Sequence, residues 1–205
     1  MVRVKICGIT NLGDALSSIK AGCDALGFVF YKKSPRYITS QKASRLIRQL
    51  PAKIIKIGVF ANAREKTIRH IAQLCRLDML QFHGNESAQF CDKFRNYKVI
   101  KAFRIKDRID LAKILRYKTF AYLFDAFVKS RLGGTGKRFN WNLCADLAKI
   151  KQPVFLSGGL TEKNVGQAIK TLHPDWVDVS SYVEVAPGKK DPQKLKGFMS
   201  VVRKK

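Results

Sequence analysis

Two segments far apart in the chain carry an amine, a thiol and a carboxyl that meet if the segments are neighbouring strands. Segment 2–7 reads VRVKIC, and its alternation places Lys5 and Cys7 on one face and the valines and isoleucine on the other. The same alternation in segment 176–181, WVDVSS, turns Asp178 to the inner face. A buried ammonium is costly unless it is paired, so we expect a Lys5–Asp178 ion pair. We also expect the ammonium to lower the pKa of the Cys7 thiol and to favour the thiolate.

A second carboxyl, Asp125, directly follows the apolar run AYLF. A thiol and a carboxyl across one pocket provide a base and an acid, which suits an isomerisation that moves protons. Taken alone, these residue types leave other roles open. Cys7 is also compatible with core packing, a metal site, half a disulfide or a nucleophile, and Asp125 with a loop or helix-capping carboxylate.

Groups suited to anion binding follow three of the expected strands. Arg36, in the stretch FYKKSPRY, carries a guanidinium that binds a carboxylate or phosphate through two hydrogen bonds. The stretches SGGL and DVSSYVEVAPGKKDP lie near the end of the chain, where this order of elements usually forms a phosphate site. We expect the phosphate to be held by backbone N–H groups of Gly158, Gly159, Ser180 and Ser181.

Strand-type and helix-type segments alternate along the whole chain. Eight such pairs predict an α/β fold, a single (β/α)8 barrel domain over residues 1–205, with the site at the carboxyl ends of its strands. An open doubly wound sheet is less compatible, because CGITNL lacks the G-x-G-x-x-G fingerprint. The expected strands are 2–7, 25–30, 53–60, 79–82, 98–105, 121–125, 153–158 and 176–181. The expected helices are 11–22, 40–50, 65–75, 86–94, 108–117, 141–150, 162–172 and 192–202.

Local signals refine three of these segments. Asp191 followed by Pro192 predicts the N-terminus of the last helix, and Thr161 is the expected N-cap of the helix before it. The stretch RLGGTGKRF departs from the P-loop pattern, so we interpret 126–138 as a flexible loop that closes over the mouth of the barrel.

The composition indicates an enzyme or binding protein of the cytoplasm. No apolar run has the length of a membrane span or of the core of a secretion signal, so we expect no membrane association. The five cysteines form no C-x-x-C pair, and we expect neither a metal site nor disulfides. Four of them are expected to be small buried side chains: Cys23, Cys75, Cys91 and Cys144.

The net charge of +25 is spread over the whole chain. Such a field attracts a small phosphorylated substrate at low salt, and it predicts only weak, salt-sensitive association with nucleic acid, with no specific site. For the assembly we expect a monomer or a homodimer.

With these residues in hand, the chain resembles the phosphoribosylanthranilate isomerase family over essentially its whole length. The motifs that carry the resemblance are VKICGIT, GFVFYKKSPRYI, GVFAN, LQFHG, IKAF, FD at 124–125, GGTGKRFNW, LSGGLTEKNV and VDVSS…VE…PGKKD. The resemblance implies an Amadori rearrangement in tryptophan biosynthesis that needs no metal and no organic cofactor. N-(5-phosphoribosyl)anthranilate would become 1-(2-carboxyphenylamino)-1-deoxyribulose 5-phosphate.

The resemblance also implies roles for individual residues. Asp125 matches the general acid that protonates the furanose ring oxygen, and Cys7 matches the general base that removes the proton from C2′ of the ribose. Arg36 matches the residue that holds the anthranilate carboxylate, and with Asp178 we assign it to substrate binding. One position departs from the pattern: Tyr182 replaces a glycine beside the expected phosphate site. Two outcomes are open: either the backbone donors survive and the ring turns away, even adding a hydroxyl donor, or phosphate binding is weaker and Tyr182→Gly would restore it.

Two alternatives stay open. One is a related barrel enzyme acting on another phosphorylated sugar. An epimerase of that kind needs several metal-binding residues at strand ends, where His83 is the only histidine, and a histidine-pathway isomerase needs aspartates where this chain has Cys7 and KAFR. The other is a non-catalytic descendant that binds polyanions, which the intact Cys7, Arg36 and Asp125 argue against.

Overall fold

The computed structural model describes residues 1–105, 110–126 and 150–204. Cys144 lies outside these ranges, as do the expected loop 126–138 beyond Ala126 and the expected helix 141–150 before Ile150. Within the described residues, no helix is long and apolar enough to cross a membrane.

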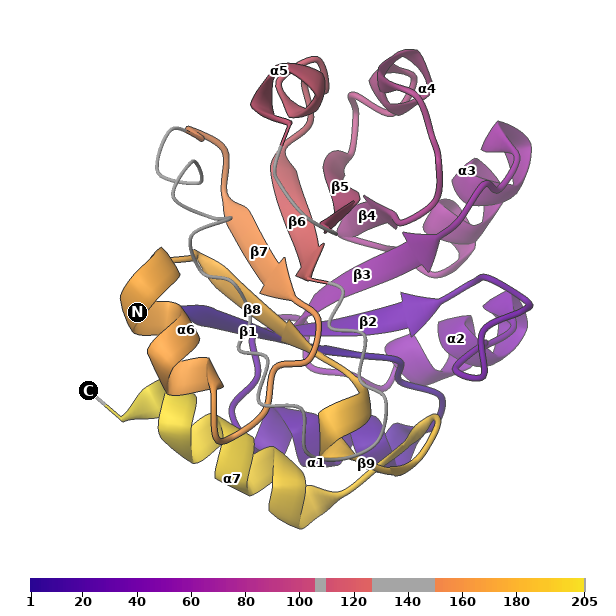
Figure 1. Ribbon diagram of the computed structural model, residues 1–205. Helices are drawn as coiled ribbons and strands as arrows, with labels where there is room; N and C mark the ends of the chain where they lie inside the picture. The colour runs from indigo at the N-terminus through magenta and orange to yellow at the C-terminus, as the bar shows by residue number, and fades with distance from the viewer. Residues whose placement is uncertain (106–109, 127–149, 205) are drawn as a thin grey trace.

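Eight parallel strands close into one barrel in the order in which they occur along the chain (Figure 1). The predicted (β/α)8 architecture is therefore confirmed. Pairing between the first and last strands closes the ring, and Lys5 is in register with Asp178. The strands are β1 (Arg3–Cys7), β2 (Ala25–Val29), β3 (Ile55–Phe60), β4 (Met79–Phe82), β5 (Lys98–Ile105), β6 (Ala121–Ala126), β7 (Val154–Ser157) and β8 (Trp176–Val179).

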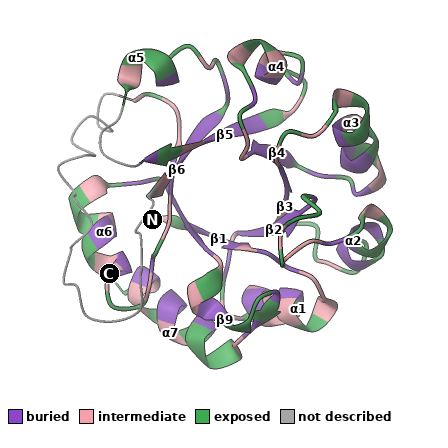
Figure 2. Cartoon of the chain, turned by 45° about the vertical axis from the view of Figure 1, so that its right-hand side comes forward, coloured by how far each residue is buried: buried purple, intermediate pink, exposed green. Residues whose placement is uncertain are grey.

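Helices surround the ring of strands, and their buried residues face it (Figure 2). Each is amphipathic or short, so its apolar side chains pack on the outward face of the sheet. The helices are α1 (Leu12–Lys20), α2 (Ser40–Ile47), α3 (Glu65–Leu74), α4 (Ala88–Asp92), α5 (Leu111–Ile114), α6 (Val165–Leu172) and α7 (Pro192–Arg203). The end of α7 returns to the start of the barrel, where Arg203 Nη1 donates to the Val2 carbonyl at 3.0 Å.

The structure confirms one predicted helix start and corrects another. Asp191 caps α7, with its side chain accepting from the N–H groups of Gln193 and Lys194. Thr161 is not the N-cap of α6; the helix begins at Val165 and Asn164 is the flanking residue. The Asn164 side chain accepts from the Thr161 N–H at 2.7 Å, so it closes a turn before the helix instead of Thr161 capping it.

Alternation along the strands divides the barrel interior into an apolar floor and a polar mouth. The floor includes Phe155 and Trp176, whose rings stack with centroids 4.7 Å apart, and Arg3 lies over the Trp176 ring. Further toward the carboxyl ends of the strands, the inward residues become polar. The apolar floor excludes water below that layer, so chemistry is confined to the mouth.

After β8 the chain forms a short 3-10 helix, η2 (Ser181–Val183), and a hairpin of β9 (Glu184–Ala186) and β10 (Lys189–Lys190). This hairpin packs back on the start of the chain. Thr10 Oγ1 donates to the Gly188 carbonyl at 2.6 Å, and the Lys190 N–H donates to Asp14 at 2.7 Å. The hairpin therefore belongs to the mouth of the barrel, next to the end of β1.

Candidate active site

Lys5 is the central charged group of the barrel mouth. Its side chain is fully buried, and its Nζ lies 3.1 Å from Asp178 Oδ1 and 2.7 Å from Gln81 Oε1. The predicted Lys5–Asp178 ion pair is therefore confirmed. Burial disfavours the ammonium, but Asp178 and Cys7 outweigh that cost, and the pKa of Lys5 is raised above its ordinary value.

Cys7 ends β1 with its thiol next to the Lys5 side chain. Both lie over Gly27 of β2: a Cβ at that position would be 2.8 Å from Cys7 Sγ and 3.0 Å from Lys5 Cε. Burial raises the pKa of the Cys7 thiol, and the lowering effects of Lys5 and Lys190 do not compensate. The expectation of a lowered pKa is thus wrong, because removal of the thiolate from water outweighs the nearby ammonium and Asp178 opposes it.

Asp125, the acidic residue of β6, is joined to Lys5 by the side chains of Gln81 in β4 and of His83, which directly follows β4. Gln81 is buried in β4, and its Nε2 lies 2.9 Å from His83 Nδ1. His83 Nε2 in turn lies 3.2 Å from Asp125 Oδ2. Polar contacts therefore run without interruption from the Cys7–Lys5 pair at one side of the mouth to Asp125 at the other.

Gln81 and His83 had no assigned role in the sequence-based site. The available signal was the position of His83 directly after the strand 79–82, together with a glutamine two residues earlier on the same face.

The neighbouring loop is held by a buried ion pair, Lys101–Glu86, with Nζ and Oε2 2.8 Å apart. Glu86 also accepts from the N–H of Asn62 at 2.7 Å.

Arg36 lies at the same mouth, across the backbone of Gly8. A Cβ at position 8 would be 2.5 Å from Arg36 Cδ, and Gly8 has a φ of +83°, so both space and conformation require glycine there. Glu184 of β9 accepts from Arg36 Nε at 2.9 Å and from Nη2 at 2.6 Å. Glu184 therefore fixes one edge of the Arg36 guanidinium. The sequence predicted Arg36 at the mouth of the barrel but did not identify Glu184 as its partner.

Lys190 of β10 completes this second cluster. Its Nζ donates to the carbonyl of Cys7 at 2.6 Å and to Glu184 Oε1 at 2.8 Å. Burial disfavours the Glu184 carboxylate, but the hydrogen bonds from Arg36 and Lys190 hold its pKa below the ordinary value. The Lys190–Glu184 pair thus connects the arginine to the end of β1.

The expected phosphate-binding residues lie at the ends of β7 and β8. Gly158 and Gly159 have φ values of +91° and +63°, and the 3-10 helix η2 begins at Ser181. Ser180 Oγ donates to the Cys7 carbonyl at 3.0 Å, so its hydroxyl is engaged within the protein.

Tyr182, the departure from the family pattern, lies within η2. It is not among the described residues with positive φ, and its ring packs against the hydrophobic core that surrounds the barrel. The backbone at this position therefore does not require glycine. The backbone conformation of Tyr182 therefore gives no reason to expect weaker phosphate binding.

The other described cysteines are buried, as predicted, with exposed fractions of 6% for Cys23, 1% for Cys75 and 3% for Cys91. Burial raises the pKa of their thiols to about 12, about 11 and about 12, respectively. Among the described residues, no group of three His, Cys, Asp or Glu side chains is arranged to hold a metal ion.

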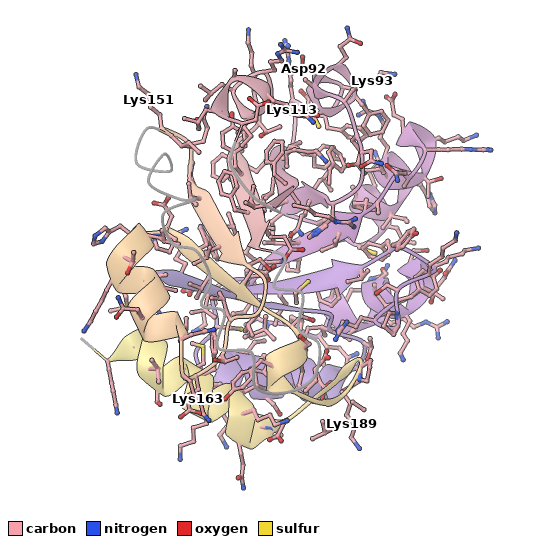
Figure 3. All side chains as sticks on the ribbon, in the orientation of Figure 1. Asp92, Lys93, Lys113, Lys151, Lys163 and Lys189 are labelled. Atoms are coloured by element: carbon pink, nitrogen blue, oxygen red, sulfur yellow. The ribbon has the colours of Figure 1, made fainter. Side chains whose placement is uncertain are left out.

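The basic residues labelled in Figure 3, such as Lys113 and Lys163, lie at the periphery of the molecule, away from the barrel centre.

Comparison with known proteins agrees with this geometry. Residues 4–201 match the family described as N-(5′-phosphoribosyl)anthranilate isomerase. The enzyme of that name from Pelobacter propionicus is 48% identical over 203 residues, which cover 99% of this chain and 96% of that protein.

Two solved structures are similar over 99% of both chains. One is phosphoribosyl anthranilate isomerase in complex with reduced 1-(o-carboxyphenylamino)-1-deoxyribulose 5-phosphate, with a TM-score of 0.89 and 41% identity. The other shows monomers generated from the dimeric enzyme of Thermotoga maritima, with a TM-score of 0.88 and 39% identity.

Proposed function

The chain belongs to the N-(5′-phosphoribosyl)anthranilate isomerase family, and on that premise we propose how its residues carry out the reaction. The reaction is the isomerisation of phosphoribosylanthranilate in tryptophan biosynthesis. The observation that supports the residue roles is the chain of contacts from Cys7 through Lys5, Gln81 and His83 to Asp125.

Asp125 acts as the general acid. Its proton passes to the furanose ring oxygen, the bond from that oxygen to C1′ breaks, and the anthranilate nitrogen forms a Schiff base with C1′. Asp125 is 30% exposed in its side chain, so it is accessible from the mouth. A carboxyl at the end of β6 meets the positional requirement for a catalytic group in this fold.

Cys7 acts as the general base, taking the C2′ proton so that an enolamine forms and then tautomerises to the ketone. Since burial raises the pKa of its thiol, the thiolate is a strong base when it forms. Lys5 next to it stabilises the thiolate by its positive charge.

Arg36 and Asp178 bind the substrate. The Nε edge of Arg36 is occupied by Glu184, and we assign the remaining edge of the guanidinium to the anthranilate carboxylate. The phosphate is held by backbone N–H groups of Gly158, Gly159, Ser180 and Ser181.

Residues 1–205 form a single barrel domain that acts in the cytoplasm. The domain is a monomer or a homodimer, and light scattering tests which of the two forms in solution.

The decisive assay generates phosphoribosylanthranilate in situ from anthranilate and the phosphoribosyl donor and follows the decay of its fluorescence. Cys7→Ser and Asp125→Asn are each expected to lower kcat by about 10²- to 10⁴-fold, the usual contribution of acid–base catalysis. Cys75→Ser is the matched control, because Cys75 is buried away from the mouth. Full activity in Cys7→Ser would contradict the role of the thiol.

A further inference from the structure

The direction of every hydrogen bond between Lys5 and Asp125 follows from one fact about Lys5. An ammonium only donates, so the Gln81 atom 2.7 Å from its Nζ must be the carbonyl oxygen. The Gln81 amide group is therefore oriented with its NH2 toward His83. Because Gln81 is 1% exposed, bulk solvent does not compete for these hydrogen bonds.

The orientation of Gln81 in turn determines which nitrogen of His83 carries hydrogen. The Gln81 NH2 lies 2.9 Å from His83 Nδ1, so Nδ1 must accept and must be unprotonated. A neutral imidazole then carries its hydrogen on Nε2. That N–H donates to Asp125 Oδ2 over 3.2 Å.

We propose that His83 is a positioning residue for the acid of the reaction: held as the Nε2–H tautomer by Gln81, it occupies Asp125 Oδ2 and leaves the transferable proton on Oδ1. The catalytic part of this inference rests on the proposed function. When the Oδ1 proton passes to the furanose oxygen, the C1′–O bond breaks with its electron pair on that oxygen. Asp125 becomes a carboxylate, which the Nε2–H group stabilises without moving.

The surroundings of His83 keep it in place. Lys101 Nζ donates to the carbonyls of Phe82 and Gly84, on either side of His83, at 3.3 and 2.7 Å. This fixes the backbone from which the imidazole projects, and the charge of Lys101 is balanced by Glu86.

Among the described residues, the strands around this part of the mouth contribute three further charged groups. From β5, Arg104 is in register with Asp125 and is exposed. From β1, Lys5 acts through Gln81, and its charge is balanced by the ion pair with Asp178 of β8.

The tautomer is measured directly in the unmodified protein labelled with ¹⁵N-histidine, by long-range ¹H–¹⁵N correlation at pH 8, where free imidazole is neutral. The chain has three histidines, and exposed His70 and His173 are assigned with the variants His70→Gln and His173→Asn. We expect His83 to show a protonated Nε2 and an unprotonated Nδ1. A protonated Nδ1 would overturn the proposal whether or not the protein is active.

Two substitutions separate positioning from packing. The amide of a glutamine reaches the place of Nε2 and can still donate to Asp125, whereas an asparagine reaches only the place of Nδ1. We expect His83→Asn to lower kcat by about 10- to 100-fold with little change in KM, and His83→Gln to retain most of the activity. Equal kcat values in the two variants would refute the positioning role.

Discussion

Replacing Lys5 by methionine tests whether the buried ion pair maintains the fold as well as the site. Nζ lies 3.1 Å from Asp178 Oδ1, and at an effective dielectric constant of about 20 this separation corresponds to about 5 kcal/mol of attraction. Without Lys5, the Asp178 carboxylate is left 6% exposed, with a hydrogen bond from Ser157 Oγ at 3.3 Å. We therefore expect Lys5→Met to lower the free energy of unfolding by about 3–5 kcal/mol.

The assay is equilibrium unfolding in urea at pH 7, followed by tryptophan fluorescence and circular dichroism. The matched control is Lys56→Met, because Lys56 pairs with Asp78 at 2.8 Å but Asp78 is 42% exposed. We expect the control to lose about 1 kcal/mol or less. The double variant Lys5→Met/Asp178→Asn should be more stable than Lys5→Met, since no unpaired charge remains buried. Equal losses in Lys5→Met and Lys56→Met would refute the reasoning.

The pH dependence of this stabilisation follows from the raised pKa of Lys5. The ammonium is favoured in the folded state, so its contribution is fully present below about 10.4, the ordinary lysine value, and is lost as pH rises through the higher folded value. The stability difference between the parent and Lys5→Met should thus be constant from about pH 6 to 9 and narrow only above about pH 10.4.

Four further outcomes are expected. Gly27→Ala should lower kcat/KM by about 10-fold or more, because its Cβ would lie 2.8 Å from Cys7 Sγ; unchanged kinetics would contradict the close packing. Alkylation of Cys7 by iodoacetamide, followed by mass spectrometry, should be slower at pH 7 than that of a free thiol and accelerate at alkaline pH, since burial raises its pKa. Tyr182→Gly should lower Tm without raising kcat/KM, because the ring is packed and its φ is not positive. Glu184→Gln should raise KM about 10-fold by weakening the hold on Arg36, with kcat little changed; an unchanged KM would argue against that hold.

The barrel was predictable from the sequence because the alternation of residues within each strand indicates which side chains are buried on each face. Lys5 and Asp178 illustrate this: both stand at inward positions of alternating segments, and barrel closure brings them into register. The position of Asp125 near the end of β6 was predicted from the apolar run AYLF that precedes it. The order of residues along the strands was therefore sufficient to place Asp125, Cys7 and the Lys5–Asp178 ion pair at one mouth of the barrel.

The side-chain hydrogen-bond networks were harder to predict from the sequence, because they depend on distances between different helices, strands and loops. Glu184 and Lys190 reach Arg36 and Cys7 through a hairpin whose fold-back has no periodic signal. The direction of the Cys7 pKa shift could not be predicted from the residue types either. Burial raises this pKa and the Lys5 ammonium lowers it, and only the packing around the thiol determines which effect is larger. Thr161 shows the same limit locally, where Asn164 supplies the competing side chain.

The contact between Lys190 and the carbonyl of Cys7 joins residues 183 positions apart in the sequence, and it has a consequence for biosynthesis. At about 5–20 residues per second, a ribosome needs about 10–40 s to travel from the first of these residues to the second. During that interval the first strand lacks both neighbours from the end of the chain, β8 and the hairpin. Until its last elements emerge, the nascent chain therefore exposes an unpaired edge of β1, the kind of edge at which other chains can pair and aggregate.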